Sequence, residues 1–505
     1  MKRISSFESV IGNAHGIPVH LFANEQVKVE NSAIEELLGF LELQHTLEQI
    51  QHTDPDFFGT SDIGIGRVAI TPDFHKGSGI PIGTTITTKG FILPQAIGKD
   101  INCGMRLYVT DLSEDQVRSK LKEMTKRIRH VYFQGGRELP ITPHQKKALL
   151  QHGLQGLWET SHETAGKGLW RQYNALQQET DLQRVIDRGS LQAGGIFNGL
   201  ENYTSIDYTS YDAQLGSIGG GNHFVEVQRV ADITEGAIAY EWGLKKDAVV
   251  VMIHTGSVSI GYPTAMAFKD YLTDLYPTGL RKPDNGILPL PISEKYAGFV
   301  ENFFMGLYNA ANFAFANRLF LGLMMQKVFS EFFGEMDFRL LYDSGHNMVW
   351  QQKTAGEEWF LHRKGACPAR GAEQLQNTPF AWTGEPALIP GSMGTSSFIL
   401  AGCGNEQSNF SASHGAGRSL SRGESMKYDE AAFAKFLEEF HIITPIDPES
   451  TEIKSRRDII QKWHDELKKE APFAFKPVRP VIDTQLEAGI VRQVAETRPI
   501  FTVKG

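Results

Sequence analysis

Cysteine is scarce in this chain: only Cys103, Cys367 and Cys403 occur among 505 residues. An odd number of cysteines in so long a chain offers no disulfide framework and is typical of a reducing compartment. The two basic residues near the start are followed by no apolar segment of the kind found in secretory signals. We therefore expect a cytoplasmic protein.

Excess positive charge is also missing, because 50 Lys and Arg residues stand against 59 Asp and Glu residues, a formal net charge of −9. This balance excludes a polybasic coat for nucleic acid or for an anionic membrane, although it is compatible with a local basic groove. Any contact with nucleic acid is therefore expected to be local.

The sequence lacks an uninterrupted apolar run long enough to cross a bilayer. Its most apolar segment, 299–325, contains several polar and charged residues, namely Glu301, Asn302, Asn309, Asn312, Asn317 and Arg318. A bilayer span tolerates such residues poorly, whereas a helix inside a large protein can give them hydrogen-bonding partners. We predict a buried helix behind a polar site, and we expect no membrane contact.

Common nucleotide-binding signatures are missing too, because the sequence has no Walker A motif and no GxGxxG in a Rossmann context. The chain has instead a series of short glycine-rich stretches that carry His, Cys, Asp or Ser, at 72–83, 100–105, 219–227, 254–257, 344–347, 390–397 and 413–418. Glycine lets a backbone approach a ligand closely and adopt positive φ. These stretches therefore predict loops built around a ligand.

Hydrophobic periodicity predicts three helices, over 32–50, 113–130 and 429–440. Ser32 with Glu35 forms a possible capping box at the first of them. The apolar, β-branched segment 247–257 is typical of a buried strand that delivers His254 at its end.

The rest of the sequence is organised without a clear linker. Residues 140–190 predict an exposed helical excursion, and 276–292, with four prolines, predict a long loop. Because the glycine-rich stretches extend over most of the chain, we expect a single large mixed α+β domain over residues 1–505, with these two excursions.

Five residues in these stretches form a possible metal-binding set: Asp100, Cys103, His223, His254 and His346. Such a mixture of oxygen, sulfur and nitrogen donors suits Mn²⁺, Zn²⁺ or Fe²⁺ better than Mg²⁺ or Ca²⁺. Alternation along a strand after His223 predicts Asn222, Phe224 and Glu226 on one face and His223 on the other. The alternatives are a small buried cysteine and ordinary buried histidines that bond to the backbone.

A second group of residues is suited to phosphate. His414 precedes the turn Gly415, Ala416 and Gly417, and Arg418 and Arg422 follow it. Backbone N–H groups in such a turn form an anion nest, arginines contact phosphates, and a histidine here is a candidate nucleophile toward phosphorus. Ser392 and Ser397 could cradle a second phosphate or a base edge, and a polar surface turn is the alternative.

Taken in order, the stretches resemble the RtcB family of GTP-dependent RNA ligases over most of the chain. The motifs that carry the resemblance are those given above together with NAANFAFANR (309–318), HRKGA (362–366) and VKG (503–505). The resemblance implies a fold of its own with two Mn²⁺ ions, guanylylation of a histidine by GTP and transfer of GMP to an RNA 3′-phosphate. It further implies sealing by a 5′-hydroxyl, prior opening of a 2′,3′-cyclic phosphate and an archease-like activating partner.

The same resemblance implies roles for individual residues. His414 would be the guanylylated nucleophile, and Asp100, Cys103, His223, His254 and His346 would hold the metals with Cys103 bridging. Arg418 and Arg422 would meet phosphates of RNA or nucleotide. The guanylate would be lined by Asn222, Phe224, Glu226, Ser392, Ser397, Gly415, Ala416, Gly417 and Lys504.

Three departures from the family pattern leave other functions open. The family usually has Gly at the position of Asn102, Arg at that of Val258 and a Tyr-Lys-Asp segment at 475–477, which here begins with Phe475. Val258 removes an expected phosphate contact, and Phe475 lacks a hydroxyl expected near the guanine. The alternatives are a divergent paralogue that caps RNA ends or hydrolyses phosphoesters without efficient sealing, and a binding protein without catalysis.

Overall fold

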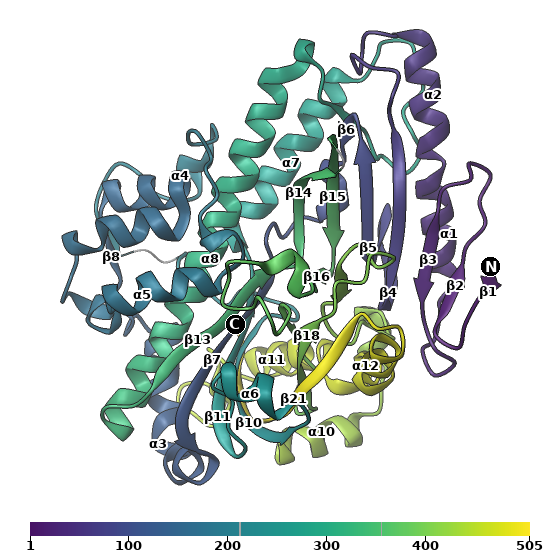
Figure 1. The fold of residues 1–505 in the computed structure, drawn as a ribbon. Coiled ribbons are helices and arrows are strands. Elements are labelled where there is room, and N and C mark those ends of the chain that lie inside the picture. Colours follow the sequence, from purple (N-terminus) through teal and green to yellow (C-terminus); the bar gives the residue numbers. More distant parts are fainter. Residues whose placement is uncertain (212–213, 355) are drawn as a thin grey trace.

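Two largely antiparallel sheets form the centre of the computed structural model, which describes residues 1–211, 214–354 and 356–505 (Figure 1). The larger sheet has the order β13-β7-β11-β10-β21-β18-β17, with β20 also beside β21. Its strands are β7 (Gly104–Ser113), β10 (Phe224–Ile233), β11 (Ala248–Thr255), β13 (Phe338–Gly345), β17 (Pro386–Ile389), β18 (Ser397–Gly402), β20 (Ile442–Ile443) and β21 (Val491–Val503).

The second sheet has the order β1-β2-β3-β4-β5-β15-β14. Its strands are β1 (Lys2–Arg3), β2 (Glu8–Val10), β3 (Val19–Phe22), β4 (Gly64–Ser78), β5 (Ile80–Lys89), β14 (Asn347–Thr354) and β15 (Glu357–Lys364). Three short two-stranded ladders pair β6 (Phe91–Ile92) with β12 (Leu290–Pro291), β8 (Pro140–Ile141) with β9 (Ser210–Tyr211), and β16 (Ala366–Pro368) with β19 (Ser411–Ser413).

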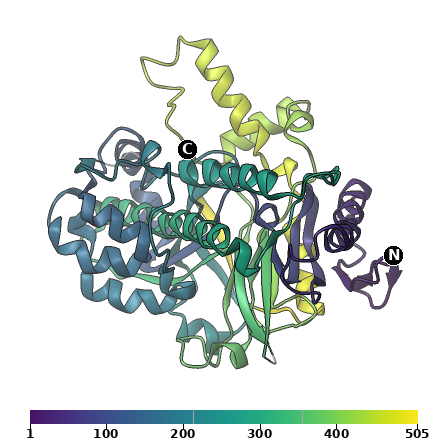
Figure 2. The same cartoon turned by 90° about the horizontal axis from the view of Figure 1, so that it is seen from above.

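Helices surround these sheets, so the predicted α+β class is confirmed. Figure 2 shows α4 and α5 (blue) on one side of the molecule and α1 and α2 (purple) on the other. The helices are α1 (Asn31–Leu41), α2 (Leu43–Thr53), α3 (Glu114–Phe133), α4 (Pro143–Thr160), α5 (Ala175–Asp181), α6 (Gly236–Glu241), α7 (Val258–Leu275), α8 (Ala297–Phe333), α9 (Arg422–Ser425), α10 (Glu430–Glu439), α11 (Arg457–Lys469) and α12 (Val478–Glu487).

The register of the larger sheet brings four strand ends to one edge. In β11, His254 lies opposite Phe224 of β10 and opposite Met105 of β7. Gly104, the first residue of β7, lies opposite Gly345, the last residue of β13. Because neighbouring strands run in opposite directions, β7 and β10 begin where β11 and β13 end. Loops far apart in the sequence therefore meet at this edge.

Helix α8 is the buried helix predicted for the apolar segment 299–325. Its polar side chains Asn309, Asn312, Asn317 and Arg318 are fully buried. They bond to backbone groups of neighbouring segments, as when Asn309 donates to Leu150 O (2.9 Å) and accepts from Phe197 N (2.7 Å). In the described parts of the chain, no helix combines the length and apolar character needed to cross a membrane.

Two of the three predicted helices are confirmed, and the prediction of the third is wrong in two respects. Ser113 caps α3 in a capping box with Gln116, and α10 lies within 429–440. The segment 32–50 instead forms two helices, α1 and α2, which meet at Glu42. The predicted capping box at Ser32 is absent, because α1 begins at Asn31 and its first turn has no side-chain cap.

The two predicted excursions differ in how much of them is exposed. Residues 140–190 are helical, as predicted, but α4 packs against α8. Its buried leucines are Leu149, Leu150, Leu154 and Leu157, so this segment also contributes to the core. The segment 276–292 is a loop between α7 and α8, interrupted only by the short strand β12.

A buried ionic cluster connects α8 to the larger sheet. Asp343 of β13 accepts from Arg318 Nε (2.9 Å) and from Arg106 Nη1 of β7 (2.9 Å), and all three side chains are inaccessible to solvent. Removing one partner from such a cluster leaves an uncompensated charge in a medium of low dielectric constant.

We predict that Asp343→Ala lowers the free energy of unfolding by about 3–5 kcal/mol, because both arginines lose their buried counter-charge. Urea denaturation of this variant and of the wild-type protein checks the prediction. The control is Asp284→Ala, which breaks the exposed Arg281–Asp284 pair (2.7 Å) and should cost no more than about 1 kcal/mol. Equal midpoints for the two variants would contradict the prediction.

Candidate active site

The five predicted metal-binding residues come together at the shared edge of the larger sheet. Asp100 and Cys103 lie just before β7, and His223 lies just before β10. His254 is near the end of β11, and His346 lies between β13 and β14. The antiparallel register described above therefore explains why residues more than two hundred positions apart converge.

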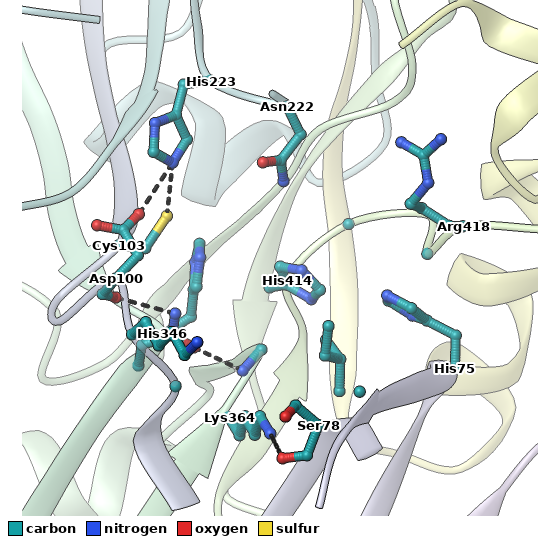
Figure 3. A pocket seen from close by; sticks show the side chains of 18 of the residues that line it. His75, Ser78, Asp100, Cys103, Asn222, His223, His346, Lys364, His414 and Arg418 are labelled. Carbon is teal, nitrogen blue, oxygen red and sulfur yellow. Dashed lines mark hydrogen bonds and ion pairs between the residues drawn. The ribbon is translucent and has the colours of Figure 1, made fainter. Parts of the chain in front are cut away.

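Their donor atoms form two overlapping groups that share the cysteine. Cys103 Sγ lies 3.3 Å from His223 Nε2 and 3.3 Å from His254 Nε2. His223 Nε2 is 3.0 Å from Asp100 Oδ2, and His254 Nε2 is 3.5 Å from His346 Nε2. One group is Asp100, Cys103 and His223, and the other is Cys103, His254 and His346. Figure 3 shows Asp100 and Cys103 beside His223, with His346 facing the same space.

The electrostatics of this cluster suit bound cations. Burial lowers the pKa of His254 and of His346 well below the ordinary value, so both imidazoles are neutral and able to coordinate a metal. Burial and the nearby Asp100 raise the pKa of the Cys103 thiol well above its ordinary value, so a cation is needed to stabilise the thiolate. In the described part of the chain, buried Asp100 Oδ2 has an ion-pair contact with His223 Nε2 (3.0 Å) but no contact with hydrogen-bond geometry. These residues fit one or two borderline metal ions.

Helix α8 holds the metal-binding loops in place, as predicted for a helix behind a polar site. Arg318 Nη1 donates to Asn102 O (2.7 Å) and to Thr255 O (2.9 Å). These carbonyls belong to the residues immediately before Cys103 and immediately after His254. A single buried side chain therefore fixes the backbone on both sides of the cluster.

His414 faces the cluster and is oriented by an aspartate. Its ring centre lies 4.9 Å from that of His346. His414 Nδ1 is 2.6 Å from Asp73 Oδ2, which also accepts from His414 N (3.1 Å). Burial opposes the charge of Asp73, but the charge and hydrogen bond of His414 prevail and lower the pKa of this carboxyl. Because the carboxylate only accepts, Nδ1 carries the proton and Nε2 keeps its lone pair.

His414 and both donor groups line a cavity of about 860 Å³. Its walls include Asn222, Phe224, Glu226, Ser392, Gly415, Ala416, Gly417, Arg418, Arg422 and Lys504. Ser397 is different: it is buried behind the wall, where its hydroxyl accepts from Gly391 N (3.1 Å) and Gln228 Nε2 (3.0 Å). It can therefore support the loop at 390–396.

The prediction that His223 and Glu226 lie on opposite faces is wrong. Phe224 and Glu226 line the cavity, while Val225 and Val227 are in the core, as strand alternation requires. His223 nevertheless lines the same cavity. The reason is that β10 begins at Phe224, so residue 223 belongs to the preceding loop and is free of the alternation.

Two ionisable side chains on the cavity wall have shifted pKa values. Burial raises the pKa of Glu226 to about 7, although Thr502 and Gln228 donate hydrogen bonds to its carboxylate. Burial lowers the pKa of Lys504 to about 8, and its ammonium donates to Gly221 O (2.6 Å). Both groups therefore change protonation near neutral pH.

The predicted phosphate-binding arginines share a buried carboxylate. Glu470, only 5% exposed, accepts from Arg418 Nη1 (3.0 Å) and from Arg422 Nε (3.2 Å). Arg418 also donates to Leu420 O and Lys469 O. Most donors of Arg418 are thus used within the protein, whereas the Arg422 side chain is 62% exposed at the cavity.

Comparison of the sequence with known proteins identifies relatives that share the part of the chain that forms this cavity. The family model described as tRNA-splicing ligase RtcB matches residues 60–505. The chain belongs to the RtcB family. It is 32% identical to the tRNA-splicing ligase RtcB of Pyrobaculum aerophilum over 468 residues, which cover 88% of each chain.

Other relatives show a similar degree of identity over similar lengths. The tRNA-splicing ligase RtcB of Thermococcus kodakarensis is 33% identical over 476 residues, again 88% of each chain. The RNA-splicing ligase RtcB of Mycobacterium bovis is 31% identical over 461 residues, which cover 88% of this chain and 98% of the relative. The similarity therefore extends across the whole cavity.

The departures from the RtcB pattern have distinct structural settings. Asn102 has φ 52°, a left-handed conformation that asparagine tolerates better than most residues, and its side chain donates to Ala311 O (2.9 Å). Val258 begins α7 with φ 48°, which is unusual for a β-branched residue. Phe475 lines the cavity, with its ring centre 5.0 Å from the Arg418 guanidinium carbon.

Sequence reasoning missed several residues of this RtcB cavity. His75 from the stretch 72–83 and Lys364 from HRKGA line the cavity, and Asp73, fully buried behind it, bonds to His414, but the motifs alone indicate no role for any of the three. These residues could have been found from the sequence, because each is an acidic or basic side chain close to a glycine. Glu470 had no such signal, because it ends the polar helix α11 and has no glycine near it.

We predict that Mn²⁺ binds at both donor groups and that Cys103→Ala abolishes this binding, because each group loses its shared thiolate. His223→Ala should weaken only one group and retain about half of the bound metal. Metal analysis after dialysis, supported by calorimetric titration, checks both outcomes. Cys403→Ala, at an exposed cysteine, is the matched control. Unchanged metal content in Cys103→Ala would refute the shared site.

Proposed function

We propose that this protein is an RNA ligase that uses GTP and Mn²⁺ to join RNA 3′-phosphate or 2′,3′-cyclic phosphate ends to 5′-hydroxyl ends. Membership of the RtcB family supports an RNA ligase, because its relatives are named tRNA-splicing or RNA-splicing ligases. The observation that carries the detailed proposal is the position of His414. It is held by Asp73, its ring centre lies 4.9 Å from that of His346, and it lines the same cavity as both donor groups.

In the first step, His414 Nε2 attacks the α-phosphorus of GTP. A nitrogen–phosphorus bond forms, and the bond from this phosphorus to the pyrophosphate oxygen breaks. Asp73 keeps the proton on Nδ1 and stabilises the positive charge that develops on the ring. Bound Mn²⁺ ions, held by Asp100, Cys103, His223, His254 and His346, would neutralise charge on the phosphate oxygens.

In the later steps, the RNA 3′-phosphate takes GMP from His414, and the 5′-hydroxyl then attacks the activated 3′-phosphorus. A new phosphodiester bond forms, GMP leaves, and the hydroxyl proton is released. A 2′,3′-cyclic phosphate would first be opened to a 3′-phosphate. Activation is needed because a free 3′-phosphate has no good leaving group.

We propose that the guanylate lies against the wall that carries Lys504. Asn222, Phe224, Glu226, Ser392 and Lys504 line this part of the cavity together with Gly415, Ala416 and Gly417. Ser397 would act from behind, through Gly391 and Gln228. Arg422, whose side chain is 62% exposed, would contact a phosphate, while Arg418 would mainly order the loop that presents His414.

Further parts of the proposal rest mainly on family membership. We infer an archease-like activating partner and a cytoplasmic location from the resemblance. We also propose that residues 1–505 act as one catalytic domain. The support for this last point is that the cavity is lined by residues from His75 to Lys504, which come from both large sheets.

The competing function is an enzyme that caps or dephosphorylates RNA ends without efficient sealing. Phe475 favours it, because an aromatic ring without a hydroxyl lies on the cavity wall. RNA with 3′-phosphate and 5′-hydroxyl ends distinguishes the two functions. Joined product supports the ligase, whereas accumulating capped or dephosphorylated ends support the alternative.

We predict that the wild-type protein accepts label from [α-³²P]GTP in the presence of Mn²⁺ and that His414→Ala accepts none. The label should survive alkali and be lost in acid, as expected for a phosphoramidate. His45→Ala, at an exposed position on α2, is the matched control and should label normally. Absence of label from the wild-type protein would refute the proposed first step.

We predict that Asp73→Asn slows guanylylation by about 10²–10⁴-fold, because an amide can donate to Nδ1 and favour the proton on Nε2. Single-turnover labelling rates check this, with melting temperature as a test of folding. Asp284→Asn, at an exposed aspartate, should leave the rate unchanged. An Asp73→Asn rate equal to that of the wild type would show that the carboxylate does not orient His414.

A further inference from the structure

One wall of the cavity has no part in the proposed guanylylation. Helix α7 contributes Tyr262, Ala265, Met266 and Lys269 to the cavity lining. Spacings of three, four and seven residues place these side chains on one face of the helix. Figure 1 shows α7 in the upper half of the molecule and α11, which ends beside Glu470, in the lower half. The cavity is therefore bounded by two distinct walls.

Tyr262 on this wall is a large aromatic side chain that is 55% exposed. The ammonium of Lys99 lies 5.2 Å from the centre of its ring. A cation over one face of an aromatic ring is a favourable contact, and it leaves the opposite face free. An exposed ring next to lysines is a combination suited to a base and its phosphates.

The α7 wall is fixed relative to the metal-binding loop. Ser257 Oγ donates to Ile101 O (2.7 Å). Gly261 permits this close approach, because a Cβ at this position would collide with Ser257 Oγ and lie 3.1 Å from Lys99 O. Lys99 and Asp100 belong to the same loop, so Tyr262 and Lys99 are held at a set position from the metal donors.

We propose that the α7 wall binds a single-stranded RNA segment leading to the metal cluster, with one base stacked on Tyr262 and phosphates at Lys99 and Lys269. This inference rests on the proposed function and assigns its RNA to a particular surface. Stacking suits a substrate of variable sequence, because every base has a flat face. The lysines also supply the local positive charge that a chain with a net charge of −9 needs for nucleic acid.

Fluorescence anisotropy with short labelled RNAs tests the proposal in the presence of Mn²⁺ and without GTP. One RNA carries a 5′-hydroxyl end and the other a 3′-phosphate end. We expect Tyr262→Ala to weaken binding of at least one RNA by about 5- to 150-fold, and Tyr262→Phe to bind like the wild type. The RNA that is affected identifies the strand on this wall.

Tyr240→Ala is the matched control, because Tyr240 on α6 is 87% exposed. Lys269→Met should reduce the slope of log affinity against log salt concentration by about 0.7 in magnitude, because one phosphate contact is lost. Unchanged affinity for both RNAs in Tyr262→Ala, with an unaltered melting temperature, overturns the proposal, as does a wild-type protein that binds neither RNA.

Failure of the proposed function gives a different pattern from failure of this inference. If the wild-type protein is not labelled by GTP but binds RNA through Tyr262, the guanylylation chemistry fails and the RNA surface stands. If it is labelled but its RNA affinity does not depend on Tyr262, the assignment of the α7 wall fails.

Discussion

The antiparallel register of β13, β7, β11 and β10 is the constraint on which the candidate site depends. It places two strand starts and two strand ends at one edge, where His254 lies near the end of β11 and the other metal-binding residues lie in the adjoining loops. Arg318 then joins the carbonyls of Asn102 and Thr255 from behind. A slip of one residue in any of these strands would turn His254 or its neighbours away from the cavity. The register of the strands in the larger sheet therefore determines the geometry of the site.

This arrangement concentrates charge and polarity in a buried region. Asp343 gives Arg106 and Arg318 a shared buried counter-charge, so these three side chains connect α8 to the sheet without needing a ligand. The metal-binding side chains differ, because burial keeps His254 and His346 neutral and Cys103 protonated. Only a cation can compensate the thiolate and the carboxylate together. The ionic cluster of Arg106, Arg318 and Asp343 thus contains its own counter-charge, whereas the metal-binding residues are suited to a bound cation.

The sequence predicted those features that local patterns encode. Strand β11 with His254 near its end, the capped helix α3 and the buried polar residues of α8 all follow from periodicity and composition. The partnership of Asp73 with His414 joins residues 341 positions apart, and no local pattern indicates it. The sequence predicted the wrong strand face for His223 because β10 begins one residue later, at Phe224, and a boundary of this kind cannot be located to a single residue from the pattern. Glu470 was missed because its role depends on its contacts with Arg418 and Arg422, which are distant from it in the sequence.

The two walls of the cavity, as we propose them, would allow an acidic protein to bind an anionic polymer. One wall carries the turn 415–417, Lys504 and Arg422 and is the proposed place of a compact nucleotide whose phosphates would sit at the turn. The other presents an exposed ring and flexible lysines, which suit an extended strand. Both walls meet at the same donor atoms, because Asp100 continues from Lys99 and His414 faces His346. Positive charge is therefore needed only along the path to the reacting phosphorus, and the remaining surface can stay acidic without weakening the contact, since charges beyond about 10 Å are largely screened by salt.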